Sequence, residues 1–127
     1  MPKENKKIIL IAEDDEILLR ALYLLLRGDM YTIASAGDGE TALKMTERLN
    51  PNLVLLDLLM PKMDGFAYLK AVKSNSVLKD IPIIVLSNLG DKEDIEKAQN
   101  LGVKDYFVKS DTRLEILSEK IKKILGS

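Results

Sequence analysis

The sequence contains no cysteine and no histidine among its 127 residues. The absence of cysteine excludes disulfides, thiolate metal sites and thiol catalysis, and it fits a reducing compartment. Without histidine, the side chains left for chemistry near neutral pH are carboxylates, lysines and hydroxyls. Any reactive site in this chain must therefore be built from these groups.

An excess of one charge and long apolar segments are also lacking. The 19 basic and 20 acidic side chains give a net charge of −1, which provides no field to attract nucleic acid or an anionic membrane. Residues 1–6 form a polar start, and the apolar run at 8–12 is too short for a signal-peptide core or a membrane span. We therefore expect a cytoplasmic protein that binds neither nucleic acid nor membrane directly.

The length and the apolar content predict one domain over residues 1–127. At 46% hydrophobic residues, a chain of this size can build a core without disulfides or a structural metal. No stretch has the composition of a linker or a low-complexity tract. A second domain is not expected.

Five short apolar runs alternate with stretches of helical periodicity, a pattern typical of a parallel sheet covered on both faces. The runs lie at 8–12, 31–35, 53–56, 83–86 and 106–108. The first, third and fourth are aliphatic and should be central, whereas the second is more polar and should lie at an edge. The prediction is an α/β fold of the flavodoxin-like (βα)5 type: a doubly wound, five-stranded parallel sheet of order 2-1-3-4-5, which binds ligands beyond the carboxyl ends of strands one and three.

Capping residues and helix breakers predict the bounds of the helices. The first ends before Gly28, the second spans 41–49, the third follows a cap at Asp64 and spans 65–74, and the fourth spans 92–101. Thr112 and Glu115 have the spacing of a capping box and predict the start of the fifth helix.

Carboxylate, hydroxyl and amine side chains follow four of the apolar runs. Glu13, Asp14 and Asp15 come after the first run. Asp57, Ser87 and Lys109 follow the third, fourth and fifth runs. Acids held together at one edge of a sheet repel each other, and a hard divalent cation with a preference for oxygen relieves that repulsion. Mg²⁺ is the expected ion.

An aspartate beside such a cation can act as the nucleophile toward a phosphoryl donor. Asp57 is the candidate, and the oxygens of the transferred group would need compensating charge or hydrogen bonds, which Lys109 and Ser87 can supply.

Four motifs in this order resemble the bacterial response regulator receiver domain over essentially the whole chain. They are IAEDD at 11–15, LLDLLMPKMDG at 55–65, IVLSN at 84–88 and DYFVK at 105–109. The second motif is the most specific.

The resemblance implies a role for each matching residue. Asp57 would be the phosphoacceptor; Asp14, Asp57 and the backbone carbonyl of Leu59 would bind Mg²⁺, and Glu13 would bind it through water. Ser87 would be the switch hydroxyl, Lys109 the phosphate-binding lysine and Tyr106 the aromatic that changes packing.

The function implied is that of a phosphoacceptor in two-component signalling. A sensor histidine kinase or phosphotransfer protein would phosphorylate Asp57. The change would then reach the face formed by helix 4, strand 5 and helix 5, which would signal to a downstream protein or through a dimer of this chain. The chain would be a stand-alone receiver and no enzyme beyond its own phosphorylation and dephosphorylation.

Two local features distinguish this sequence. The family usually has proline after the lysine, held in a cis peptide bond, but Ser110 follows Lys109 here; the bond is expected to be either trans with a rearranged loop or cis and strained. Leu59 and Leu89 lie two residues beyond Asp57 and Ser87, and our hypothesis is that their bulk hinders water and slows self-dephosphorylation.

Plainer interpretations exist for each residue taken alone. Asp57 could be a turn former, Glu13 to Asp15 a helix cap, Lys109 a surface amine and Tyr106 a strand tyrosine without function; Asp15 is expected to cap only. Two rival functions also remain: a phosphohydrolase with an aspartate nucleophile, whose signature has a second Asp where Leu59 stands, and an interaction module that works without phosphorylation.

Overall fold

The computed structural model describes residues 6–28 and 30–126, so most of the predicted polar start lies outside the described residues. Strands and helices alternate along the described chain. In chain order the elements are β1 Lys7–Ala12, α1 Glu16–Leu26, β2 Tyr31–Ala36, α2 Gly39–Leu49, β3 Leu53–Leu56, α3 Gly65–Lys73, β4 Ile83–Ser87, α4 Lys92–Asn100, β5 Asp105–Val108, the 3-10 turn Lys109–Asp111 and α5 Leu114–Leu125.

The strands form one parallel sheet of order β2-β1-β3-β4-β5. Every residue of β3 and β4 is buried, whereas β2 is only partly buried. The predicted topology is confirmed, with the aliphatic runs in the centre and the more polar run at an edge. Because all strands point the same way, their carboxyl ends meet at one edge of the sheet.

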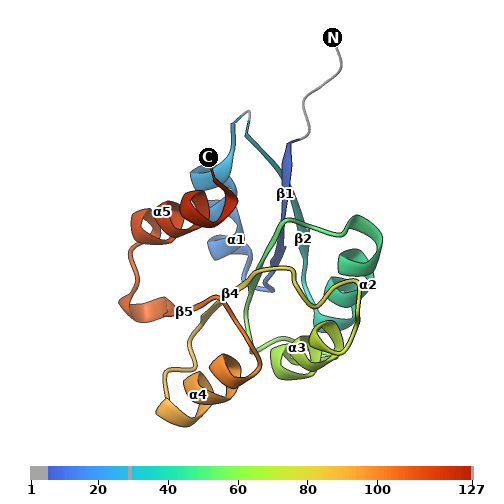
Figure 1. Cartoon of the computed structure of the whole chain (residues 1–127). Helices are drawn as coiled ribbons and strands as arrows, with labels where there is room; N and C mark the ends of the chain where they lie inside the picture. The colour runs from blue at the N-terminus through green and yellow to red at the C-terminus, as the bar shows by residue number, and fades with distance from the viewer. Residues whose placement is uncertain (1–5, 29, 127) are drawn as a thin grey trace.

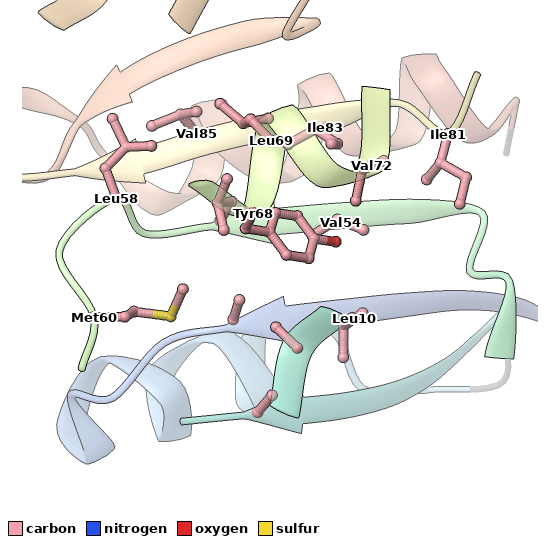
Figure 2. Close-up of a cluster of buried hydrophobic side chains, with 14 of the residues drawn as sticks. Leu10, Val54, Leu58, Met60, Tyr68, Leu69, Val72, Ile81, Ile83 and Val85 are labelled. Atoms are coloured by element: carbon pink, nitrogen blue, oxygen red, sulfur yellow. The ribbon is translucent and has the colours of Figure 1, made fainter. Parts of the chain in front are cut away.

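Helices cover both faces of the sheet, with α1 and α5 on one side and α2, α3 and α4 on the other (Figure 1). Each face buries its own apolar cluster. On the second face the Tyr68 ring of α3 lies among Val54, Leu69 and Val72 (Figure 2). Among the described residues, none of the helices is long and apolar enough to cross a membrane.

Aspartates cap three of the helices, and two of these caps, Asp15 and Asp64, were predicted from the sequence. The Asp15 carboxylate accepts hydrogen bonds from the N–H groups of Ile17 and Leu18, which confirms its role as the cap of α1. Asp38 and Asp64 cap α2 and α3 in the same manner.

The capping box predicted at Thr112 is wrong. The helix α5 begins at Leu114 with Arg113 as its cap residue, and no side chain caps it. The Thr112 hydroxyl donates instead to the carbonyl oxygen of Val108, at 2.8 Å. The reason is the 3-10 turn Lys109–Asp111, which folds the chain back and places the hydroxyl beside the end of β5 rather than beside the first turn of α5.

Candidate functional site

The sheet register brings the acidic residues together at the carboxyl edge. Ala12 of β1 pairs with Leu56 of β3, so Glu13 and Asp57 each come one residue after a paired position. Backbone hydrogen bonds continue past the strands: the Asp57 N–H donates to Ala12 and the Glu13 N–H donates to Ala36. The backbone therefore fixes both residues before any side-chain contact forms.

Glu13, Asp14 and Asp57 each present a carboxylate oxygen within 4.8 Å of the other two. Glu13 is 3% exposed and Asp57 is 4% exposed, whereas Asp14 is exposed. Burial raises the pKa of Glu13 and the charge of Asp57 adds to the rise, although hydrogen bonds from the Asp15 N–H and from Lys109 oppose it. Negative charge is thus gathered at a point that stays open to solvent on the Asp14 side.

Lys109 is the cation that faces this charge. Its Nζ lies 2.9 Å from Asp57 Oδ2 and 2.9 Å from Glu13 Oε1. Burial by itself lowers the pKa of Lys109, but its hydrogen bonds and its attraction to Asp57 and Glu13 outweigh burial and raise that pKa. The amine is therefore held in its charged form between the two buried carboxylates.

The peptide bond between Lys109 and Ser110 is trans, since the described residues contain no cis peptide bond. Of the two conformations left open by the sequence, the structure shows the trans bond, followed directly by the 3-10 turn. Lys109 still reaches both acids. A proline after Lys109 is therefore not required for the lysine to contact both buried acids.

A second hydrogen bond orients Asp57. Its Oδ1 accepts from the N–H of Leu59 at 3.0 Å, while its Oδ2 accepts from Lys109 at 2.9 Å. Each carboxylate oxygen thus has a donor of its own, and the carboxylate plane is set by the loop after β3. The side chain of Leu59 is 51% exposed, so it stands at the mouth of the site rather than in the core.

Ser87 and Tyr106 contact the same residue from different strands. Ser87 is fully buried, and its Oγ accepts a hydrogen bond from the Leu89 N–H at 3.3 Å. The Tyr106 hydroxyl donates to the Leu89 carbonyl oxygen. Burial raises the pKa of Tyr106 to about 12, and the carboxylates of Asp94, Asp57 and Asp91 add to the effect, so the hydroxyl stays protonated. The loop after β4 therefore links the two predicted switch residues.

The donor set fits a hard divalent cation. It consists of carboxylate oxygens alone, two of them buried and one open to solvent, and this is the ligand type that Mg²⁺ and Mn²⁺ prefer. All the predicted site side chains lie at the carboxyl edge of the sheet. The backbone of Leu59 lies at the same edge, and its N–H donates a hydrogen bond to Asp57.

One contact of the loop after β3 was not among the predictions from the sequence. Gly39, the first residue of α2, lies against the loop that carries Leu59 and donates its N–H to the Pro61 carbonyl oxygen at 3.4 Å. A glycine directly after a capping aspartate, where a longer side chain would suit the helix better, is the one signal that could have pointed to it.

Comparison with known proteins agrees with this geometry. Residues 9–121 match the family model described as the response regulator receiver domain. The probable transcriptional regulator ycf27 of Porphyridium aerugineum is 39% identical over 121 residues, which cover 95% of this chain and 49% of that protein.

Solved structures with this fold include two response regulators. The manganese-bound form of response regulator Rcp1 is 31% identical with a TM-score of 0.79, covering 93% of this chain and 91% of that chain. The phosphorylated cyanobacterial phytochrome response regulator RcpA is 32% identical with a TM-score of 0.78, covering 94% and 91%. The chain spans 40% to 49% of the length of four of the curated relatives it matches.

Proposed function

The chain belongs to the response regulator receiver domains of two-component signalling, and from this premise we propose that Asp57 is its phosphoacceptor. The observation that carries the proposal is the contact of one buried carboxylate with both a lysine and a cluster of acids. An ion pair that served stability alone would need one carboxylate and one lysine. Three carboxylates gathered at one point instead destabilise the fold unless a cation binds them.

In the proposed reaction, an oxygen of Asp57 attacks the phosphorus of a phosphohistidine on a sensor histidine kinase or a phosphotransfer protein. The new bond joins Asp57 to phosphorus, the phosphorus–nitrogen bond breaks, and its electron pair returns to the donor's imidazole. Lys109 already lies 2.9 Å from Asp57, so it can pair with the negative oxygens of the group as they arrive. Ser87 can donate a hydrogen bond to the same group after leaving the Leu89 N–H.

The residues that would hold Mg²⁺ are Asp14, Asp57 and the backbone carbonyl of Leu59, with Glu13 acting through water. When bound, the ion supplies positive charge to the phosphoryl oxygens. The exposure of Asp14 gives the ion a route from solvent. Response regulator Rcp1, which is 31% identical, has a manganese-bound form, and this supports the binding of a divalent cation by the present chain.

The switch would pass through the loop after β4. When Ser87 turns toward the phosphoryl group, its hydrogen bond from the Leu89 N–H is lost. Tyr106 is bonded to the carbonyl of the same residue, so a shift of this loop changes the packing of the tyrosine. The face formed by α4, β5 and α5 would change with it.

That face would signal to a downstream protein or to a second copy of this chain, in the cytoplasm and without direct contact with nucleic acid or membrane. We propose no enzymatic activity beyond the chain's own phosphorylation and dephosphorylation. The rival phosphohydrolase needs a second acid two residues after the nucleophile, and Leu59 offers none there.

The test is incubation with Mg²⁺ and a small phosphodonor, followed by intact-mass measurement and peptide mapping. We expect a gain of one phosphoryl group on Asp57, absent in Asp57→Asn and retained in Asp64→Asn, because asparagine is also a good helix cap. No gain with any donor would favour an interaction module that works without phosphorylation. Multiple turnovers of a phosphorylated substrate would favour the phosphohydrolase.

A further inference from the structure

We infer that Gly39 is a positioning residue for the metal site: it lets the start of α2 hold the loop that carries the Leu59 carbonyl. The inference rests on the proposed function, since the metal site is part of it. It concerns residues 58–64, which join Asp57 to α3 and which we call the β3–α3 loop.

Gly39 is buried and lies against the far end of this loop. A Cβ atom placed on it would lie 2.6 Å from the carbonyl carbon of Met63 and 2.8 Å from the Met63 Cβ, and closer still to the Met63 carbonyl oxygen. Non-bonded carbon atoms pack at about 3.5 to 4.0 Å. Any side chain at this position therefore requires the loop and α2 to move apart by roughly 1 Å or more.

The loop has little freedom to absorb such a shift. The Gly65 N–H donates to the Leu58 carbonyl at 3.0 Å and closes the loop, and the Met63 N–H donates to the Pro61 carbonyl at 2.8 Å within it. Lys62, which lies between Pro61 and Met63, has a φ of 70°. A displacement at Met63 is therefore passed along a short, tied segment toward Leu59.

Backbone conformation does not explain the glycine. Gly39 is the first residue of α2 and has no positive φ, so alanine could adopt its conformation and would favour the helix by up to about 1 kcal/mol. Gly37, two residues earlier, offers a contrast: a Cβ there would meet nothing within 4 Å. Close approach of the loop is what remains to require a glycine at position 39.

The consequence for the metal follows from the strict geometry of Mg²⁺. The ion demands near-octahedral oxygen ligands at about 2.0 to 2.1 Å, so a carbonyl displaced by a sizeable part of 1 Å no longer fits the shell. Partners that orient metal ligands typically change metal affinity by about 10- to 100-fold when they are altered. We expect Gly39→Ala to weaken Mg²⁺ binding by about tenfold or more.

The experiment compares the wild type, Gly39→Ala and Gly37→Ala by amide NMR, first without metal and then during a Mg²⁺ titration. The metal-free spectra report the loop itself: in Gly39→Ala the amides of residues 58–64 should shift, and in Gly37→Ala they should not. The titration reports the affinity, which should fall in Gly39→Ala alone. A role limited to stability would leave the affinity of the folded protein unchanged.

The outcomes separate the two proposals. A folded Gly39→Ala variant with wild-type affinity overturns the inference about Gly39. Absence of Mg²⁺ binding by the wild type and by Gly37→Ala overturns the metal site itself.

If Gly39→Ala does not fold, Met63→Gly tests the same contact from the loop side, because it removes the Met63 Cβ, one of the three atoms that lie against Gly39. Lys62→Gly is its control, since it places a glycine in the same loop, at a residue whose φ of 70° suits glycine, without removing an atom that faces Gly39. Several-fold weaker binding in Met63→Gly alone supports the inference, and equal affinity in the two variants overturns it.

Discussion

Replacing Lys109 with methionine removes the positive charge that faces the buried acids. In the structure its amine lies within 2.9 Å of both Glu13 and Asp57, whose side chains are 3% and 5% exposed. Methionine keeps much of the aliphatic stem but leaves two neighbouring carboxylates without their cation. We expect the metal-free protein to be destabilised and to bind Mg²⁺ more tightly, because the acids no longer have an internal partner.

The magnitude follows from the burial of the pair. Removing one partner of a fully buried ion pair costs about 3 to 5 kcal/mol. The Lys109 side chain is 16% exposed and Asp14 opens the site to water, so solvent screens part of the uncompensated charge. We expect a loss of about 2 to 3 kcal/mol in the free energy of unfolding.

The assay is urea unfolding followed by circular dichroism at neutral pH, with a chelator and then with Mg²⁺. Lys104→Met is the matched control, since Lys104 is exposed and forms no ion pair among the described residues; its change should stay within about 0.5 kcal/mol. Because Mg²⁺ can take the place of the lost cation, the destabilisation of Lys109→Met should shrink when the ion is added. Wild-type stability of Lys109→Met in chelator would refute the reasoning.

Three further predictions follow from the same geometry. Replacing Leu59 and Leu89 together with asparagine should shorten the lifetime of the phosphoryl group on Asp57, timed by loss of labelled phosphate; an unchanged lifetime would reject the hypothesis that their bulk hinders water. Gly65→Ala should destabilise the protein by about 1 to 3 kcal/mol in thermal or urea unfolding, because an added Cβ would lie 2.6 Å from the Leu58 Cα. Burial raises the pKa of Tyr68 to about 12, above its unfolded value near 10. The stability that the neutral phenol contributes is therefore complete below about pH 10 and is lost as the pH rises toward about 12. The stability advantage of the wild type over Tyr68→Phe should shrink between about pH 10 and pH 12, and a constant difference would contradict the assignment.

The fold was predictable because each strand carries its own signal. The aliphatic runs that became β3 and β4 are buried on both faces, and the alternating run that became β2 lies at the edge. Parallel order then fixes where the polar residues meet, so the convergence of Glu13, Asp57 and Lys109 needed no information beyond strand direction. The predicted helix bounds were less accurate than the strands: α2 begins at Gly39, whereas the sequence predicted a start at Thr41.

Contacts between distant segments were not predictable in the same way. Thr46 of α2 and Tyr68 of α3 share a buried hydrogen bond of 2.7 Å, yet each residue is unremarkable in its own helix. At Thr112 the local sequence predicted a contact that does not form. Its hydroxyl donates to the Val108 carbonyl oxygen and does not cap α5. Local patterns predict elements, but which side chains meet between packed helices depends on the positions of both backbones.

The residue after Lys109 shows how a departure from the family pattern is tolerated. Proline there would have restricted the backbone by itself, whereas Ser110 leaves the chain free to follow a trans bond into the 3-10 turn. The position of the lysine amine is set instead by its ion pairs with Glu13 and Asp57 and by β5, whose register with β4 ends at Val108. The charge cluster thus helps to place the residue that compensates it. The site should therefore lose its geometry when the acids are neutralised together, even though the sheet beneath it would persist.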